Sequence, residues 1–485
     1  MIKEFISMQE YFIELSKYVI TVLVVLYTVC SLSAFRYRSM SEKKGIYVIQ
    51  VILMFATQLV CFLNLEFESG DVQYFFLYAF VQIFLFATVT LVNLIYEKPN
   101  RLLLNNMCML LGMGMCILSR LSIKEATKQY IIVMISLTIS LTIPFLLSHI
   151  HFLKKLTWIY AATGILLLGI VLVMGQVSHG SKLYYTFKVF GGITIQPSEF
   201  VKIIFLFFLA GALWKEVSVQ RVALTAVLAG MHVIILVLSR DLGSALIFFV
   251  GYVLVVFVAS RNYLYLMLGV AGGCAAALAA YRLFDHVQTR VLAWRDPWSY
   301  IDNQGYQITQ SLFAVGSGSW FGMGLLKGNP KAIPYVESDF IFSAICEEMG
   351  LIVGICLLLI CVSSFLAIME IAIEIHDRFY QLIVFGIGVV YIFQIFLTVG
   401  GGTKFIPLTG VTLPFVSYGG SSIMTNMFMF FIIQGIYMRL QQEGGQNNIS
   451  PRKTFEQSPE NMNQEDRNKK VMQKGDDGLV WEEIE

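Results

Sequence analysis

The chain has 485 residues, of which 57% are hydrophobic and 14% are charged, and its formal net charge is +2. A soluble protein of this length would need more charge to cover its surface, and a nearly neutral chain gives no reason to expect nucleic acid as a partner. Apolar runs of about twenty residues recur along the sequence, each long enough to cross a bilayer. The sequence therefore predicts an all-α, polytopic membrane protein.

About thirteen transmembrane helices are predicted. The first is interpreted as an anchor rather than a signal peptide, because Glu4 and Glu10 accompany a single Lys3 before it and its apolar run is too long. The predicted spans are residues 11–35, 45–65, 72–95, 102–122, 129–150, 156–177, 198–214, 221–239, 242–259, 263–282, 340–369, 379–400 and 421–438.

The short loops predict the orientation. Five loops on one side carry lysine or arginine, whereas the facing loop 66–71 carries neither, so the positive-inside rule makes the first set cytoplasmic. The amino terminus and the segments 178–197, 283–339 and 401–420 are then expected outside, although Lys124 and Lys128 also fall outside. The basic loops are residues 36–44, 97–101, 151–155 and 215–221, and the turn at Arg261.

The polar tail and the metal-ligating residue types give further expectations. Residues 441–485 are rich in Gln, Asn, Glu, Lys and Asp, so this tail is expected to be cytoplasmic and disordered. The eight cysteines lie mostly in apolar runs without CxxC spacing and are interpreted as small core residues. The six histidines show no ligand spacing, and no zinc site is predicted.

Asp339 is the main candidate for chemistry, because it stands where the polar segment 283–339 meets the next apolar run. One interpretation is a helix N-cap whose charge suits the helix dipole. The other is a general base at the mouth of a cavity, with its pKa raised by a partly dry site. Glu337, Glu347 and Glu348 lie close in sequence, and such a cluster near lipid requires water, a cation or basic partners.

Basic residues that could serve as partners occur in two pairs. Glu199 and Lys202 are spaced i, i+3 and could neutralise each other on one helical face or contact a ligand. Arg240 and Asp241 lie between two predicted spans, where they could form an interhelical ion pair or belong to a site. Lys182 lies in the first outer segment.

Two further segments have unusual composition. The glycine-rich stretch 316–324 lacks the strand and helix of a dinucleotide-binding loop, so a re-entrant or interfacial segment is expected, whose N–H groups could still face a pyrophosphate. The prolines and glycines of 405–422 predict irregular backbone. It is either a tight extracellular hairpin or is covered by protein or a water-filled cavity.

Six motifs in order resemble the SEDS family, the shape, elongation, division and sporulation proteins of bacteria typified by FtsW and RodA. The resemblance covers about residues 100–440. The motifs are QPSEFVK (196–202), RDLGSA (240–245), GYQITQS (305–311), AVGSGSWFGMGL (314–325), SDFIFSAICEEMG (338–350) and PLTGVTLPFVSYGGSS (407–422).

The resemblance implies a ten-helix catalytic core at 101–440, with three extra helices in 1–100 and the tail at 441–485. It implies polymerisation of lipid II on the outer face of the bacterial cytoplasmic membrane, with release of undecaprenyl diphosphate. Asp339 would take a proton from the acceptor sugar hydroxyl. A class B penicillin-binding transpeptidase and other divisome or elongasome membrane proteins are the implied partners. A lipid II flippase and a non-catalytic scaffold are the alternatives.

The resemblance also implies substrate contacts, and a divalent cation (Mg or Mn) could offset diphosphate charge. This chain departs from the family where Arg240 replaces the usual proline and where Ser338 precedes Asp339, with the histidine of the usual pattern absent. Lys182 could stand in for a family arginine. The implied substrate-binding residues are Lys182, Glu199, Lys202, Arg240, Asp241, Gln307, Gln310, Ser311, Glu337, Glu347 and Ser417.

Overall fold

The computed structural model describes residues 2–37, 40–150, 152–178, 181–187 and 193–449. The chain divides into two compact units, Met1–Leu440 and Gln441–Glu485, and the first is described below. Twelve helices in the described part are long and apolar enough to cross a membrane. The predicted class of an all-α membrane protein is confirmed.

The helices that follow the chain in order are given with their bounds. They are α1 (Ile2–Ser33), α2 (Met40–Ser69), α3 (Gln73–Ile95), α4 (Arg101–Leu121), α5 (Ile123–Ser140), α6 (Ile143–His149), α7 (Thr157–Met174), α8 (Pro197–Leu213), α9 (Val219–Leu238), α10 (Leu242–Ser260), α11 (Tyr263–Leu283), α12 (Asp285–Arg295), α13 (Tyr306–Gly318), α14 (Ile341–Met349), α15 (Leu351–Glu374), α16 (Arg378–Gly402) and α17 (Gly420–Ile449).

Two boundaries differ from the sequence prediction. The span predicted at 340–369 is two helices, α14 and α15, separated at Gly350, whose φ is +96°. The last helix, α17, continues to Ile449, past the predicted start of a disordered tail at 441. The predicted span at 198–214 corresponds to α8, which has 17 residues. Residues 450–485 lie outside the described residues.

The break at Gly350 is closed by backbone hydrogen bonds from the segment that follows α13. Leu351 N donates to Ser319 O at 2.9 Å, and Ile352 N donates to Trp320 O at 3.2 Å. The first residues of α15 lack helical partners for their N–H groups. The carbonyl groups of the preceding segment therefore take the place of a helical turn.

The glycine-rich segment packs against the same break from its other side. Met323 N donates to Glu347 O and Gly324 N donates to Glu348 O, both at 2.9 Å. A Cβ at Gly318 would lie 1.9 Å from the carbonyl oxygen of Cys346, so only glycine allows the two backbones to approach this closely. The suggestion that these N–H groups face a pyrophosphate is wrong for residues 323 and 324, which are already paired.

A small antiparallel sheet between α7 and α8 was missed. Its strands β1 (Gln176–Ser178), β2 (Ser181–Phe187) and β3 (Ile193–Ile195) lie in the order β1-β2-β3. β2 pairs with β3 through Tyr185 and Ile195. Tyr, Thr and Ile suit a strand. Lys182 lies on β2, and its side chain is outside the described residues.

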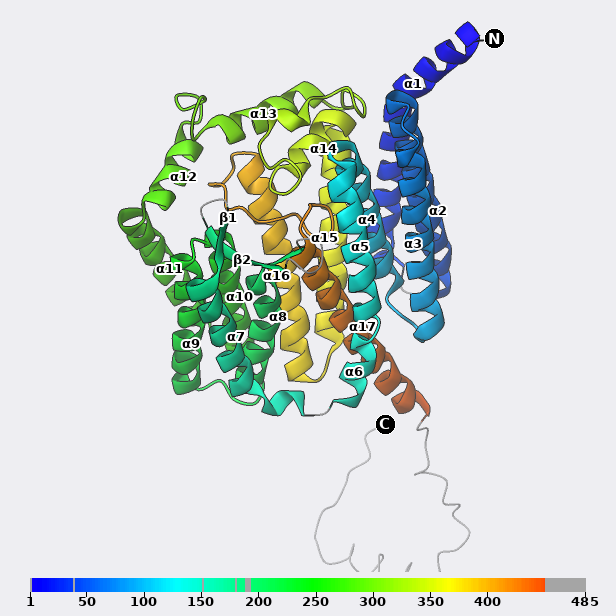
Figure 1. The fold of residues 1–485 in the computed structure, drawn as a ribbon. Helices are drawn as coiled ribbons and strands as arrows, with labels where there is room; N and C mark the ends of the chain where they lie inside the picture. Colours follow the sequence, from blue (N-terminus) through cyan, green and yellow to red (C-terminus); the bar gives the residue numbers. More distant parts are fainter. Residues whose placement is uncertain (1, 38–39, 151, 179–180, 188–192, 450–485) are drawn as a thin grey trace, which may run out of the picture. The chain divides into compact units, whose positions relative to one another are not determined.

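The helices α1 to α3 pack beside α4 and α5 (Figure 1), with α1 also against α15. A buried polar cluster joins these elements: Tyr27 OH donates to Asn106 Oδ1 at 3.1 Å, and the Ser31 and Ser363 hydroxyls are 2.7 Å apart. Hydrogen bonds between helices contribute to association in lipid, where apolar contact alone does not distinguish partners. This packing is therefore specific.

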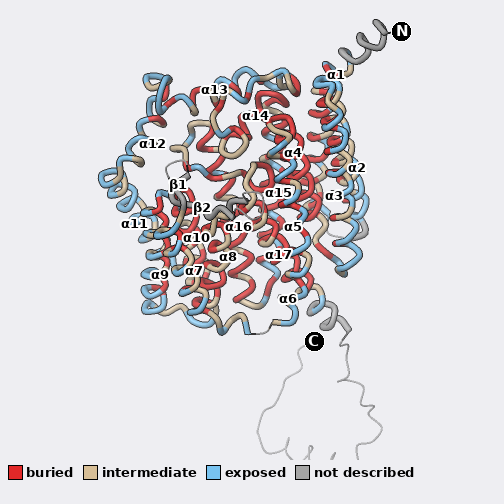
Figure 2. Tube along the Cα trace, viewed as in Figure 1, coloured by how far each residue is buried: buried red, intermediate tan, exposed pale blue. Residues whose placement is uncertain are grey.

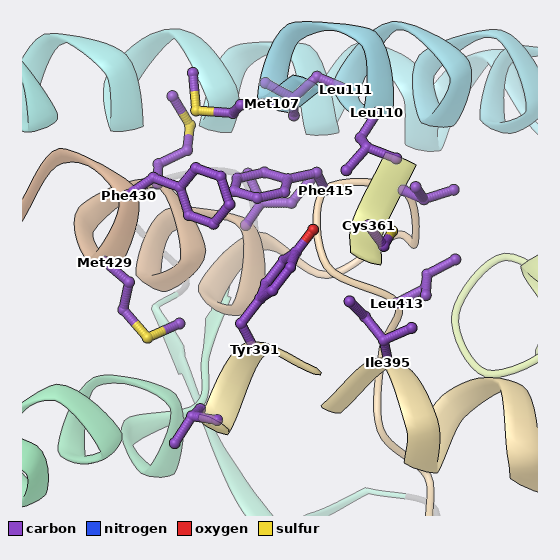
Figure 3. Close-up of a cluster of buried hydrophobic side chains, with 14 of the residues drawn as sticks. Met107, Leu110, Leu111, Cys361, Tyr391, Ile395, Leu413, Phe415, Met429 and Phe430 are labelled. Carbon is purple, nitrogen blue, oxygen red and sulfur yellow. The ribbon is translucent and has the colours of Figure 1, made fainter. Parts of the chain in front are cut away.

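The core lies along α4, α14, α15 and α16, whereas the described side chains of α11 are all partly or fully exposed (Figure 2). At its centre, Tyr391, Phe415 and Phe430 pack together (Figure 3), with Phe415 and Phe430 ring centroids 4.7 Å apart. Phe415 belongs to the irregular segment between α16 and α17. Of the two interpretations of that segment, the structure shows the one in which protein covers it.

Candidate functional site

Asp339 lies in the loop before α14, at the end of the bundle where α12, α13 and α14 lie (Figure 1), which we call the loop side. The N-cap residue of α14 is Phe340, without a side-chain cap bond, so Asp339 does not occupy the N-cap position. Asp339 is half-buried. A Cβ built on Gly410, whose φ is +74°, would lie 3.8 Å from Asp339 Oδ2. Its carboxylate therefore faces the irregular segment between α16 and α17.

That segment holds the Asp339 loop by direct hydrogen bonds. The Ser417 hydroxyl donates to Ser338 O, and Leu413 N donates to Ser417 Oγ at 2.9 Å. Tyr418 N donates to Glu337 O at 2.7 Å. Burial raises the pKa of Tyr418, and the Glu337 carboxylate is one of the charges nearby that raise it further. Ser417 thus fixes the loop of the predicted base.

Arg290 on α12 completes this site, and the sequence interpretation missed it. Its Nη1 donates to the carbonyl oxygens of Leu408 and Thr409, at 3.1 Å each. Burial lowers the pKa of Arg290, and the nearby carboxylates of Asp339 and Asp241 oppose that effect. Arginine stays charged in proteins. One guanidinium therefore lies close to two carboxylates that are 98 residues apart in the chain.

Asp241 joins the start of α10 to the start of α8. Its Oδ1 accepts from Ser244 N at 3.0 Å, and its Oδ2 accepts from Ser198 Oγ at 3.2 Å and from Gln196 Nε2 at 3.3 Å. As N-cap of α10 it satisfies a free helical N–H group. Arg240, its neighbour, is exposed and lines a cavity described below.

Glu199 and Lys202 form a buried pair on α8, which is the structural one of the two arrangements considered. Lys202 Nζ lies 2.7 Å from Glu199 Oε2 and donates to Gln394 Oε1 at 3.0 Å, with the Lys202 side chain only 1% exposed. Gln394 Nε2 in turn donates to Thr412 O at 3.0 Å. The pair therefore supports the irregular segment from below through Gln394.

The remaining candidates take different positions. Ser311 is buried, with its hydroxyl 2.6 Å from the Ser343 hydroxyl and donating to Gly402 O at 2.7 Å. Glu347 Oε1 accepts from Asn329 N at 2.7 Å. These contacts tie α13 and α14 to neighbouring segments. Gln307 and Gln310 are half-buried on α13.

A buried ion pair anchors the loop between α13 and α14. Arg120 Nε, at the end of α4, lies 2.7 Å from Glu348 Oε1, and the two side chains are 7% and 1% exposed. Arg120 Nη2 also donates to Gly328 O at 3.0 Å. The sequence indicated Glu348 but not its partner, because 228 residues separate the two.

Within the part of the chain that the structure describes, no group of three or more His, Cys, Asp or Glu side chains could hold a metal ion. The protein groups around Asp339 therefore do not form a cation site by themselves, and no step below is assigned to a metal.

A family model described as cell cycle protein (FtsW, RodA and SpoVE) matches residues 101–442. The peptidoglycan glycosyltransferase RodA of Mycobacterium tuberculosis is 30% identical over 371 residues, covering 70% of this chain and 78% of the relative. The probable peptidoglycan glycosyltransferase FtsW of Aliivibrio salmonicida is 34% identical over 272 residues, covering 54% of this chain and 67% of the relative.

Two solved structures share the fold. One, described as "Structural coordination of polymerization and crosslinking by a peptidoglycan synthase complex", is 26% identical with a TM-score of 0.60, covering 72% of this chain and 100% of that chain. Rod shape determining protein RodA of Thermus thermophilus has a TM-score of 0.54 at 23% identity, covering 70% and 97%. The chain belongs to the SEDS family (FtsW, RodA and SpoVE) of peptidoglycan glycosyltransferases.

Proposed function

We propose that this protein polymerises lipid II into glycan strands, with Asp339 as the general base and undecaprenyl diphosphate as the leaving group. The observation that supports this most directly is the half-buried Asp339 carboxylate, which shares the Arg290 guanidinium with Asp241 beside the segment 408–410. Carboxylates held in a partly dry site are suited to proton transfer.

The proposed step is a direct displacement. Asp339 accepts the proton of the acceptor sugar 4-hydroxyl while that oxygen attacks the anomeric carbon of the donor. The bond from this carbon to the diphosphate oxygen breaks, and its electron pair leaves with undecaprenyl diphosphate. The configuration at the anomeric carbon is inverted. Arg290 holds the segment 408–409 and balances part of the carboxylate charge.

The loop side is proposed to face the outside of the cytoplasmic membrane, because the basic loops lie at the opposite ends of the helices. A class B penicillin-binding transpeptidase is the proposed partner, in line with the synthase complex to which the chain is similar. Other divisome or elongasome membrane proteins are proposed to join it.

The test is made on the full-length protein in liposomes that contain lipid II. We expect glycan polymers by gel electrophoresis, with the partner transpeptidase added in a parallel sample. Lipid II translocation without polymer would favour a flippase, and neither polymer nor translocation in both samples would favour a scaffold. Either of these results contradicts the proposed reaction.

Replacing Arg290 is expected to lower the polymerisation rate. Arg290→Gln removes the cation beside Asp339 and Asp241 and frees the Leu408 and Thr409 carbonyls. A displacement of about 1 Å in a reacting group can lower a rate by about 10²-fold, and we expect a loss of that order in the lipid II assay. Arg295→Gln, an exposed change on the same helix, is the control. Equal rates for the two variants would remove Arg290 from the site.

A further inference from the structure

A second cavity lies next to the catalytic candidates, and the proposed reaction does not use it. Its volume is about 550 Å³, within the range of small-molecule sites. It is formed where α9 and α11 end and α12 begins. The lining residues are Val237, Leu238, Arg240, Leu283, Phe284, Asp285 and His286.

The cavity is at the height where a lipid head group would lie. The membrane-spanning segments of α9 and α11 end at Leu238 and Leu283, and both residues line it. The wall towards the helices is apolar, from Val237, Leu238, Leu283 and Phe284, whereas the charged residues follow the helix ends. A molecule with an apolar part and a polar head matches this division.

The charged groups distinguish between kinds of head group. Arg240 supplies a cation and Asp285 a carboxylate on the same wall. A purely anionic head would meet Asp285 as well as Arg240, and like-charge contact is a means of rejecting a ligand. A head with a phosphate and an ammonium group can meet both residues with complementary charge.

His286 provides a polar atom that lacks a partner. Its Nε2 is buried and has no hydrogen-bond partner among the described residues. Burial lowers the pKa of His286, and Arg290 and Arg240 lower it further, so the imidazole is neutral near pH 7. A buried polar atom without a partner costs free energy, and an ester or phosphate oxygen of a ligand could pair with it.

Arg240 is held in an unusual conformation at this position. Its φ is +64°, in the left-handed region that non-glycine residues rarely adopt. The turn is fixed by Arg240 N donating to Val237 O at 3.0 Å and Asp241 N donating to Leu236 O at 2.9 Å. Strain of this kind is typical of binding sites.

We propose that this cavity binds the head group of a zwitterionic phospholipid of the phosphatidylethanolamine class, with the phosphate on Arg240 and the ammonium group on Asp285. The lipid would then occupy the membrane surface beside α12, the helix that carries Arg290. The site is separate from the proposed donor and acceptor positions, so it can be tested without any turnover.

The test uses the full-length protein in nanodiscs with equal amounts of phosphatidylethanolamine and phosphatidylglycerol. Lipids retained after detergent extraction are counted by native mass spectrometry. The wild type is expected to retain phosphatidylethanolamine in preference. Arg240→Gln is expected to lower that retention about tenfold, as loss of one charge-assisted hydrogen bond would. Asp285→Asn is expected to remove the preference over phosphatidylglycerol.

Arg295→Gln, an exposed arginine on α12 that does not line the cavity, is the matched control and should retain lipid as the wild type does. A photoreactive phosphatidylethanolamine is expected to label residues 237–240 or 283–286 of the wild type, a readout that needs no variant. Equal retention of both lipids by the wild type, label elsewhere, or a retained polyprenyl diphosphate in place of the phospholipid would each overturn the proposal.

Discussion

Asp339→Asn is expected to abolish lipid II polymerisation. The amide has nearly the shape of the carboxylate but cannot accept the proton of the acceptor hydroxyl, and general-base catalysis contributes about 10²–10⁴-fold to a rate. The backbone contacts that fix the loop do not involve the carboxylate: Asp339 N donates to Tyr335 O at 3.1 Å, and Ser417 donates to Ser338 O. Folding should therefore be kept, and glycan polymer should fall below detection by gel electrophoresis.

The matched control for this change is Asp302→Asn. Asp302 lies in the same long loop but is exposed, so loss of its charge should leave the polymer yield unchanged. Melting temperatures of both variants, measured in detergent, separate a loss of chemistry from a loss of fold. Polymer at the wild-type rate from Asp339→Asn would show that the carboxylate is not the base.

Hydropathy was sufficient to predict most of the helices, because a run of apolar residues long enough to cross a bilayer has few other structures available to it. It could not predict the break at Gly350, since the residues on both sides are apolar and suit a single helix. The break depends on the carbonyl groups of Ser319 and Trp320, which are brought there by tertiary packing.

The site was predicted in part for a similar reason. Asp339 and Asp241 stand out because each lies beside an apolar run, where a charge needs an explanation. Arg290 lies in a polar segment, where a charged residue is ordinarily solvated. Only the fold brings it to Leu408 and Thr409.

The sheet was missed because its strands are short and contain polar residues. Tyr and Thr in β2 favour a strand, but a run of seven residues beside longer apolar helices gave too weak a pattern. Lys182, predicted to contact substrate, lies on that strand. Its contacts remain a prediction, because its side chain is outside the described residues.

The largest effect on stability is expected from Arg120→Met. This change leaves the Glu348 carboxylate buried without its cation, since Arg120 Nε supplies both close contacts, at 2.7 and 2.8 Å. Breaking a buried pair by removing one partner costs about 3–5 kcal/mol. The change also releases Gly328 O, which Arg120 Nη2 holds at 3.0 Å. The melting temperature in detergent should fall sharply.

The double variant Arg120→Met with Glu348→Met distinguishes the charge from the anchor. Apolar residues often replace a buried ion pair at little cost, so the double variant should melt above Arg120→Met alone. Polymerisation should stay low in it, because the hydrogen bond to Gly328 O, which fixes the loop that leads to Asp339, is still absent. Lys128→Met is the control: its pair with Glu125 is partly exposed, with Lys128 45% accessible, and exposed pairs contribute about 0–1 kcal/mol. If the double variant polymerised lipid II at the wild-type rate, Arg120 would stabilise the fold without positioning the Asp339 loop.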